Sequence, residues 1–308
     1  MDSKIKGAIC GIISAITYGM NPLGALSLYD EGLNAGSVLF YRYGLAVLIL
    51  AGIMLLRKES FKIRIRQLFI CAFLGFTFVV SSFSLFISFN YMDAGVACTI
   101  LFVYPVMVAL IMAAFFKEKI TIIIMLAIFM ALAGIILLYY GGAGMALSTV
   151  GVLLVMLSAL SYAVYIVTVN KSGLYLPPVK LTFFVMLFAV LTIVIHSFLR
   201  VEYQLQLLTG MTQWGWAIML AIVPTVISLV LMVVAVKNIG STPTAIMGAL
   251  EPVTAVIIGG IVFDEIFSLR IATGMLLILI AVSIIIVEKP ISKRFFRRIP
   301  RRPDSKQQ

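Results

Sequence analysis

The chain has 308 residues, of which 63% are hydrophobic and only 11% are charged, and its net charge is +11. A soluble domain of this length carries about a quarter charged residues, so water is excluded as the solvent for most of this surface. The apolar stretches are continuous rather than alternating, which predicts an all-α integral membrane protein.

Ten apolar segments of about 17 to 25 residues follow one another, each able to cross about 30 Å of hydrocarbon at about 1.5 Å per residue. We therefore expect ten transmembrane helices. In the first half of the chain they span approximately residues 5–29, 33–56, 67–89, 94–116 and 120–140. In the second half they span approximately residues 149–169, 181–199, 214–236, 242–263 and 271–287.

Two pairs of stretches repeat along the chain. Tyr104-Pro105-Val106 and Glu251-Pro252-Val253 each begin an apolar run that ends on a glutamate 13 residues after its proline, Glu118 and Glu265, an offset of 147. Residues 14–18 (Ser-Ala-Ile-Thr-Tyr) match residues 158–162 (Ser-Ala-Leu-Ser-Tyr) at an offset of 144, and Gly7 matches Gly151. A duplicated apolar chain is typical of a transporter built from two repeats, with its site between them.

Five segments in each half is an odd number, so the second repeat enters the membrane from the opposite side to the first. The expected organisation is therefore an inverted pair of five-helix repeats. The first repeat is residues 1–140, a short outer linker is 141–148, the second repeat is 149–288, and a basic cytoplasmic tail is 289–308.

The basic residues predict the orientation. If both termini lie in the cytoplasm, 20 of the 23 lysines and arginines fall on the cytoplasmic side, and only Arg42, Arg200 and Arg270 do not. Positive charge collects on that side of membrane proteins, so we expect N-in and C-in. The tail is expected to bind anionic lipid headgroups. No folded basic module is present, so nucleic acid is not an expected partner.

Two charged residues fall well inside apolar segments. Glu251 lies near the middle of its segment, where a carboxyl group is costly and faces either a cavity or a partner on another helix. Two interpretations of Glu251 stay open. It is either a substrate-binding or proton-sensitive group, or a protonated or hydrogen-bonded group that ties two helices together, here called a helix tie. Arg42 admits three roles, which are recognition of an anionic group, pairing with Glu251, and extension to the outer headgroups.

Prolines predict helix breaks at Pro22, Pro105, Pro224 and Pro252, because proline removes one helix hydrogen bond and crowds the preceding turn. Polar and aromatic side chains near these breaks are the candidates for a substrate cavity at the midplane. The predicted substrate-binding residues are Tyr18, Asn21, Arg42, Tyr104, Tyr162, Tyr165, Thr225, Ser228 and Glu251.

The sequence contains no pattern for an enzyme, a metal site or a cofactor site. The cysteines Cys10, Cys71 and Cys98 are odd in number, lack metal-site spacing, and are interpreted as small packing residues. No phosphate-binding glycine loop, paired-histidine zinc motif or nucleophile elbow is found.

The chain resembles the EamA-type members of the drug/metabolite transporter superfamily over about residues 5–288. The resemblance rests on Ser14-Ala15-Ile16-Thr17-Tyr18-Gly19-Met20-Asn21, on Phe40-Tyr41-Arg42-Tyr43 and on the two proline-to-glutamate helices. It implies an inner-membrane transporter with a cavity formed mainly by helices one, three, four, six, eight and nine. The chain departs from the family pattern at Tyr18, where tryptophan is frequent, and at Tyr165, which matches Asn21 in the second repeat.

We therefore expect a secondary transporter that moves a small organic solute, such as an amino acid, metabolite or drug, by alternating access, with efflux as the favoured direction. Proton coupling and facilitated diffusion both remain open, and the sequence does not predict the oligomeric state. The alternatives are an exchanger of phosphorylated metabolites or nucleotide-sugars, which would need several cations in its cavity, and a membrane scaffold or sensor without transport.

Overall fold

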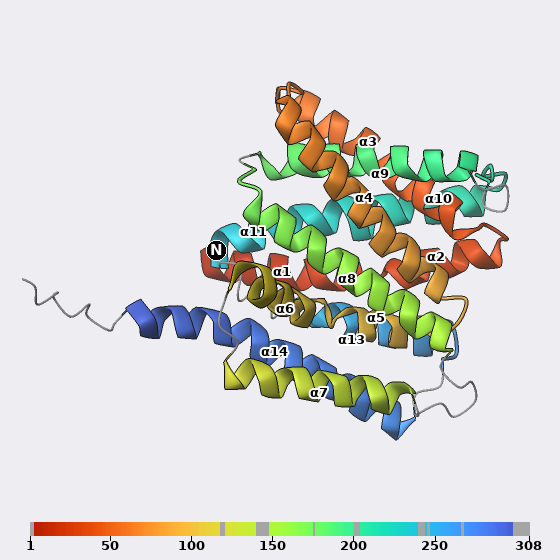
Figure 1. Ribbon diagram of the computed structural model, residues 1–308. Coiled ribbons are helices and arrows are strands. Elements are labelled where there is room, and N and C mark those ends of the chain that lie inside the picture. Colours follow the sequence, from red (N-terminus) through yellow and green to blue (C-terminus); the bar gives the residue numbers. More distant parts are fainter. Residues whose placement is uncertain are drawn as a thin grey trace, which may run out of the picture.

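The computed structural model describes residues 3–117, 121–139, 148–174, 176–199, 204–239, 244, 247–265 and 268–297, and the regular elements in these ranges are helical (Figure 1). The helices of the first repeat are α1 (Ser3–Gly19), α2 (Asn21–Asp30), α3 (Ala35–Leu56), α4 (Ile65–Ser88), α5 (Ala94–Leu101), α6 (Tyr104–Phe116) and α7 (Ile122–Tyr139). Those of the second are α8 (Thr149–Lys171), α9 (Pro178–Leu199), α10 (Met211–Ala221), the π-helix η2 (Ile222–Ile227), α11 (Ser228–Ile239), α13 (Leu250–Val262) and α14 (Leu269–Arg297).

The chain is a multi-pass helical membrane protein by the length and composition of these elements. In the described ranges, seven helical segments are long and apolar enough to cross a membrane. Three shorter apolar helices, Ile122–Leu138, Leu250–Val262 and Leu269–Ile284, lie in the other expected spans. Ten crossings and the N-in, C-in orientation therefore stay predictions. The expected linker lies almost wholly outside the described residues, as do Glu118 and the end of the tail.

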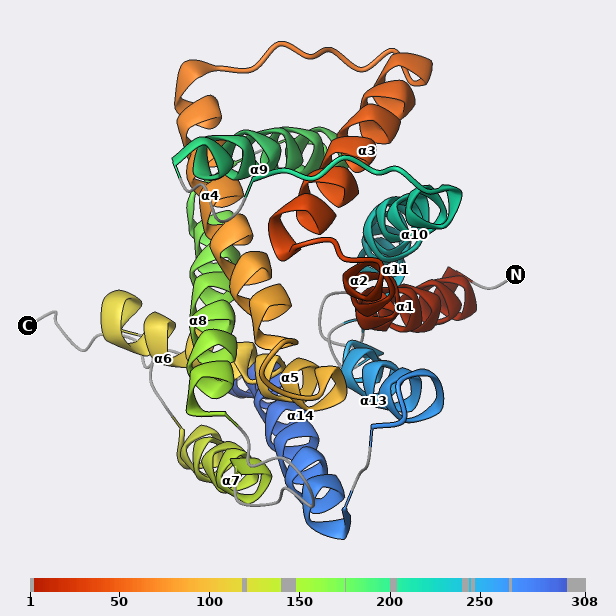
Figure 2. The ribbon, with the colours of Figure 1, turned by 90° about the vertical axis from the view of Figure 1, so that its right-hand side faces the viewer.

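Helices of one repeat pack against helices of the other in matching pairs. Helix α1 packs on α11, and its counterpart α8 packs on α4, the counterpart of α11. Helix α3 packs on its own counterpart α9 and α7 on its own counterpart α14, while α5 packs on α13, the counterpart of α6. Figures 1 and 2 show the α7–α14 pair at one edge of the molecule and the α3–α9 pair at the opposite edge. This pattern is what two repeats related by a two-fold axis produce.

Single contacts repeat in the same way. A Cβ atom on Gly7 would lie 2.7 Å from Asn238 and Ile239, and one on Gly151 would lie 2.7 Å from Met92 and 3.0 Å from Tyr91. Asn238 follows Tyr91 by 147 positions and Gly151 follows Gly7 by 144, the two offsets of the sequence repeat. At position 7 a side chain would clash with α11, and at position 151 it would meet the turn after α4, where the tip of the Met92 side chain would have to move.

Two serine pairs hold the same helices together deeper in the bundle. Ser14 Oγ donates to the Ser228 carbonyl at 2.8 Å and Ser228 Oγ donates to the Ser14 carbonyl at 3.0 Å, which joins α1 to α11. In the matching pair, the hydroxyl oxygens of Ser81 and Ser158 lie 3.1 Å apart and join α4 to α8. All four residues are buried. Each pair supplies hydrogen-bond partners to hydroxyl groups that would otherwise lack them in an apolar interior.

Glu265 joins the two repeats at the start of α5. Its Oε1 accepts from the backbone N–H of Ala94 at 2.7 Å and its Oε2 from that of Gly95 at 3.2 Å. The N-terminus of α5 thus receives a carboxylate from the loop after α13, where it satisfies free N–H groups and the helix dipole. Glu265 therefore holds a helix of the other repeat.

Candidate functional site

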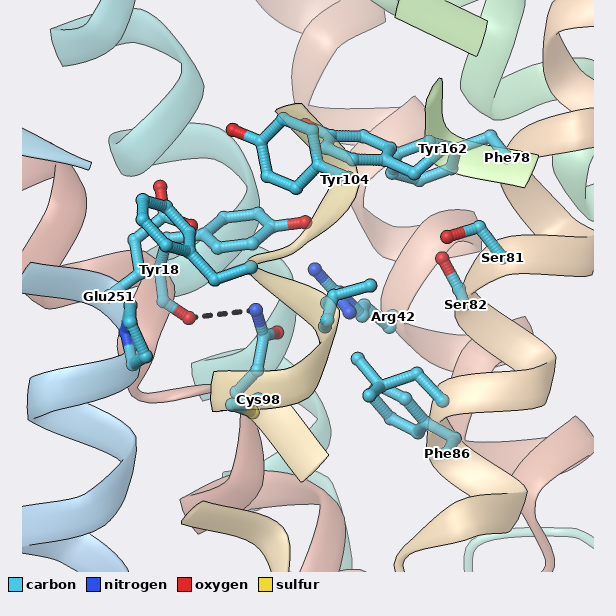
Figure 3. Close-up of a pocket in the computed structure, with 16 residues that line it drawn as sticks. Tyr18, Arg42, Phe78, Ser81, Ser82, Phe86, Cys98, Tyr104, Tyr162 and Glu251 are labelled. Atoms are coloured by element: carbon cyan, nitrogen blue, oxygen red, sulfur yellow. Dashed lines mark hydrogen bonds between the residues drawn. The ribbon is translucent and has the colours of Figure 1, made fainter. Parts of the chain in front are cut away.

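A cavity lies where the broken helices of the two repeats meet (Figure 3). About 640 Å³ of space that no protein atom fills lies between its walls, part of it open to the exterior. Its walls come from α1–α2, α3, α4, α5–α6, α8 and the start of α13. The lining residues are Tyr18, Gly19, Asn21, Arg42, Phe78, Ser81, Ser82, Leu85, Phe86, Cys98, Leu101, Phe102, Tyr104, Tyr162, Glu251 and Pro252.

The helix break before Pro22 explains the position of Asn21. Proline has no N–H, so Pro22 leaves the Tyr18 carbonyl, four residues back, without its helix donor. Asn21 Nδ2 takes this place and donates to the Tyr18 carbonyl at 2.8 Å. This bond fixes the side-chain amide, and Asn21 Oδ1 is left buried without a partner among the described residues.

The break at Pro224 is repaired in the same manner. Pro224 lies in η2 and leaves the Leu220 carbonyl without a helix donor. Thr225 Oγ1 donates to that carbonyl at 2.9 Å and accepts from Arg42 Nε, also at 2.9 Å. The sequence predicted that Thr225 lines the cavity. It does not, but it holds the side chain of Arg42, which does.

Arg42 is a buried cation on the cavity wall. Its side chain is 3% exposed, and its guanidinium carbon lies 5.3 Å from the ring centre of Tyr43 and 5.7 Å from that of Phe86. Within the described ranges no carboxylate forms an ion pair with it. The proposed extension to the outer headgroups is wrong, because the side chain is enclosed. The proposed pairing with Glu251 is not found within the described residues, where Arg42 Nε donates to Thr225.

Glu251 occupies another wall, at the second residue of α13. Its backbone N–H donates to the Gly248 carbonyl at 3.0 Å, the carbonyl that Pro252 cannot satisfy. Its side chain lines the cavity without a hydrogen bond to any other described residue. Figure 3 shows Glu251 and Arg42 on different sides of the cavity, with Tyr18 near Glu251. A helix tie would need a hydrogen-bond partner for the Glu251 carboxyl group on another helix, and the described residues supply none.

Aromatic rings form a third wall. The ring centres of Tyr104 and Tyr162 lie 4.8 Å apart at an angle of 80°, an edge-to-face arrangement. Tyr165 stacks on Tyr162 at 5.8 Å and 5° and also contacts Phe78 at 5.4 Å. Tyr165 is thus behind the wall rather than part of it, one helical turn from Tyr162 on α8.

Six of the nine predicted binding residues line the cavity, and three do not. Tyr165 supports Tyr162, Thr225 holds Arg42, and Ser228 bonds Ser14 away from the cavity. The helices also differ from those that the family resemblance implied. The second expected span contributes through Arg42 and the eighth does not reach the cavity, because its π-helix places Thr225 behind Arg42.

The lining residues of α4 and α5 were not among the predicted set. Phe78, Ser82 and Phe86 are spaced four residues apart and so share one helix face, a signal that the sequence contained. Cys98 was interpreted as a packing residue, yet it lines the cavity. Among the described residues, no group of three or more His, Cys, Asp or Glu side chains could hold a metal ion.

The fold and the cavity define a multi-pass membrane protein with a polar site shared by two repeats. The model of the EamA-like transporter family matches residues 5–140 and 149–287, which are the two repeats in turn. The chain belongs to the EamA-like transporter family, a family of transporters rather than enzymes.

Solved structures agree on the fold. A crystal structure described only as that of a protein aligns over 95% of this chain and 99% of its own, with a TM-score of 0.66 and 16% identity. At this identity the likeness concerns the fold alone. The comparison with curated proteins finds no significant match.

Proposed function

We propose that the protein is a secondary transporter that moves a small organic solute across the cytoplasmic membrane by alternating access, with efflux as the direction. The observation that carries the proposal is the cavity, which takes its polar groups from both repeats. Tyr18, Arg42 and Tyr104 come from the first repeat and Tyr162 and Glu251 from the second. A solute bound there lies between two bodies of the protein, as alternating access requires.

The proposal includes ten crossings arranged as two inverted repeats. The antiparallel contact pattern supports this arrangement, since Gly7 meets Asn238 while Ser14 meets Ser228 further along the same helix pair. Glycines and serines at these contacts let the helices approach closely, and side-chain amides and hydroxyls satisfy the carbonyls that prolines free. The breaks at Pro22 and Pro252 lie at the cavity wall, where backbone irregularity at membrane depth is tolerated.

The alternatives are less well supported. An exchanger of phosphorylated metabolites or nucleotide-sugars needs several cations, and among the described lining residues Arg42 alone carries a fixed positive charge. A scaffold or sensor without transport does not require a cavity with unpartnered charged groups.

Counterflow in proteoliposomes tests the proposal. Purified protein is reconstituted with a high internal concentration of an unlabelled solute, and entry of the labelled solute is followed. The native thiol of Cys98 supplies an internal control, because its alkylation by a maleimide fills the cavity. We expect counterflow that alkylation abolishes and that a Cys98→Ser variant retains after the same treatment. Absence of counterflow across amino acids, amines, carboxylates and neutral metabolites would contradict the proposal.

A Glu251→Gln variant tests proton coupling. If Glu251 is the coupling group, solute movement in the wild-type protein responds to an imposed pH gradient and movement in the variant does not. An unchanged gradient response in the variant removes Glu251 from that role, with Glu31→Gln, an exposed position, as the matched control.

A further inference from the structure

The segment that leads from α3 into α4 carries a dense positive charge that pairs with no described acid. It is residues 57–66, here called the basic segment, and Figure 2 shows it stretched across the top of the view from α3 to α4. Five cations and one acid, Glu59, give it a net charge of +4. All five cations are exposed, and none forms an ion pair within the described ranges. They are Arg57, Lys58, Lys62, Arg64 and Arg66.

Apolar side chains and the backbone hold the basic segment against α9. The ring centres of Phe61 and Phe183, which lies on α9, are 5.4 Å apart at an angle of 75°. Ile63 packs against the hydrophobic core. Near the start of α9, Lys180 Nζ donates to the Lys62 carbonyl at 2.6 Å. These contacts use none of the charged groups of the basic segment, so its ammonium and guanidinium groups stay available to a partner.

The corresponding segment of the second repeat makes the same connection without charges. Residues 204–209 lead from α9 to α10, and Gln206 follows Lys62 by 144 positions, an offset of the sequence repeat. The backbone N–H of Gln206 donates to Ser37 Oγ at 2.8 Å. Ser37 is the third residue of α3, as Lys180 is the third residue of α9. Because residues 204–209 contain no charged side chain, the fold of such a segment does not depend on the cations.

Large apolar side chains lie on the surface at both ends of the basic segment. Leu55 and Leu56 precede it at the end of α3, while Ile65 and Phe69 lie in the first turns of α4, and each of the four is mostly exposed. Helices α3 and α4 are both long and apolar enough to cross a membrane. Cations directly beside exposed apolar side chains match the boundary of a bilayer, where phosphate groups lie next to acyl chains.

We propose that the basic segment binds the phosphate groups of anionic phospholipids. Clusters of about four or more lysines and arginines beside a membrane helix attract such lipids. A lipid fits better than a soluble phosphate, because its acyl chains cover the flanking apolar side chains while its phosphate reaches the cations. With both termini in the cytoplasm, the cytoplasmic leaflet supplies the lipid. This site is separate from the tail, since the basic segment is held against α9.

Quenching by brominated lipids measures the lipid composition next to the basic segment. The exposed Ser60 is replaced by cysteine in the full chain without native cysteines, and the thiol is labelled with a fluorophore. The protein is reconstituted in vesicles of phosphatidylcholine with a minor fraction of phosphatidylglycerol. Bromine is carried either by the phosphatidylglycerol or by an equal amount of the phosphatidylcholine. We expect phosphatidylglycerol to be enriched at least about fivefold at the label, the effect of one lysine or arginine near the surface, and the enrichment to fall at high salt.

Two variants that each remove three cations separate the basic segment from the tail. The segment variant combines Lys62→Gln, Arg64→Gln and Arg66→Gln. The tail variant combines Arg297→Gln, Arg298→Gln and Arg301→Gln. We expect the enrichment at the label to disappear in the segment variant and to stay in the tail variant. Since the corresponding segment of the second repeat is neutral, the segment variant should fold and should melt as the wild type does in phosphatidylcholine alone.

Three outcomes overturn the proposal. Equal quenching by the two brominated lipids shows that the segment attracts no anionic lipid. Enrichment that survives in the segment variant and is lost in the tail variant assigns the lipid to the tail. Enrichment that inorganic phosphate removes, at an ionic strength at which chloride does not, assigns the site to a soluble anion. None of these measurements follows a solute, so the proposed transport function stands or falls separately.

Discussion

Single prolines and the side chains beside them determine the chemistry of the cavity. Pro22 frees the Tyr18 carbonyl and Asn21 satisfies it, while Pro224 frees the Leu220 carbonyl and Thr225 satisfies it. In both places the repairing side chain has a second function, since Asn21 presents an oxygen to the cavity and Thr225 accepts from Arg42. The breaks are therefore the means by which polar groups are oriented at membrane depth.

The bond between Thr225 and Arg42 leads to a prediction for two variants. Thr225→Val keeps the side-chain shape and removes the acceptor, so the buried Nε of Arg42 loses its partner. We expect weaker solute binding by about 1–3 kcal/mol, the usual cost of such a loss. Thr225→Ser retains the hydroxyl and should bind nearly as the wild type does. Equal binding by all three proteins in a thermal-shift assay would show that Thr225 does not position Arg42.

At the scale of helices, contacts between repeats come in related pairs, and Glu265 adds a link at the start of α5. Burial raises the pKa of Glu265 above its usual 4.5, the bonds from Ala94 and Gly95 lower it, and nearby Asp93 raises it further. Because the net shift is upward, the folded state holds this proton more tightly than the unfolded state. The contribution to stability is then fully present below pH 4.5 and is lost as the pH rises through the raised pKa.

Glu265→Gln removes the titratable group at the start of α5 and keeps the size and shape of the side chain. The variant does not titrate, so the melting temperature of the wild type relative to the variant should fall as the pH rises above 4.5 and through the raised pKa of Glu265. Asp264→Asn changes an exposed neighbour and is the control. A difference in melting temperature that grows with pH would contradict the raised pKa of Glu265.

Glu265→Ala leaves two N–H groups of α5 without acceptors and should destabilise the protein by about 1–3 kcal/mol for each.

The serine pairs test the relation between the repeats. On a background without native cysteines, Ser14→Cys with Ser228→Cys and Ser81→Cys with Ser158→Cys should each form a disulfide on mild oxidation. The hydroxyl oxygens lie 3.3 Å and 3.1 Å apart in the two pairs, which suits the short Cβ separation of a disulfide. The exchanged combination of positions 14 and 158 is the control and should stay reduced. Cross-linking of only one of the two native pairs would contradict the symmetric packing.

At the scale of the whole molecule, the sequence predicted the family, the two repeats and six cavity residues because each depends on local patterns. Prolines, ionisable groups in apolar segments and a repeated offset are visible along the chain. The partner of Arg42 was not predictable, since Thr225 is 183 positions away and is one of many polar residues in the spans. Phe78 and Phe86 were missed because a phenylalanine that lines a cavity has the same local pattern as one that faces lipid.

The measurement that tests the central claim most directly is the sidedness of Tyr18 and Tyr162, which are equivalent residues of the two repeats and line one cavity. On a cysteine-free background, Tyr18→Cys and Tyr162→Cys are treated with a membrane-impermeant maleimide from either side of oriented vesicles. Because inversion places matched residues at mirror-image depths, position 18 should react mainly from the outside and position 162 mainly from the inside. Reaction of both positions from the same side would contradict an inverted pair of repeats around a shared cavity.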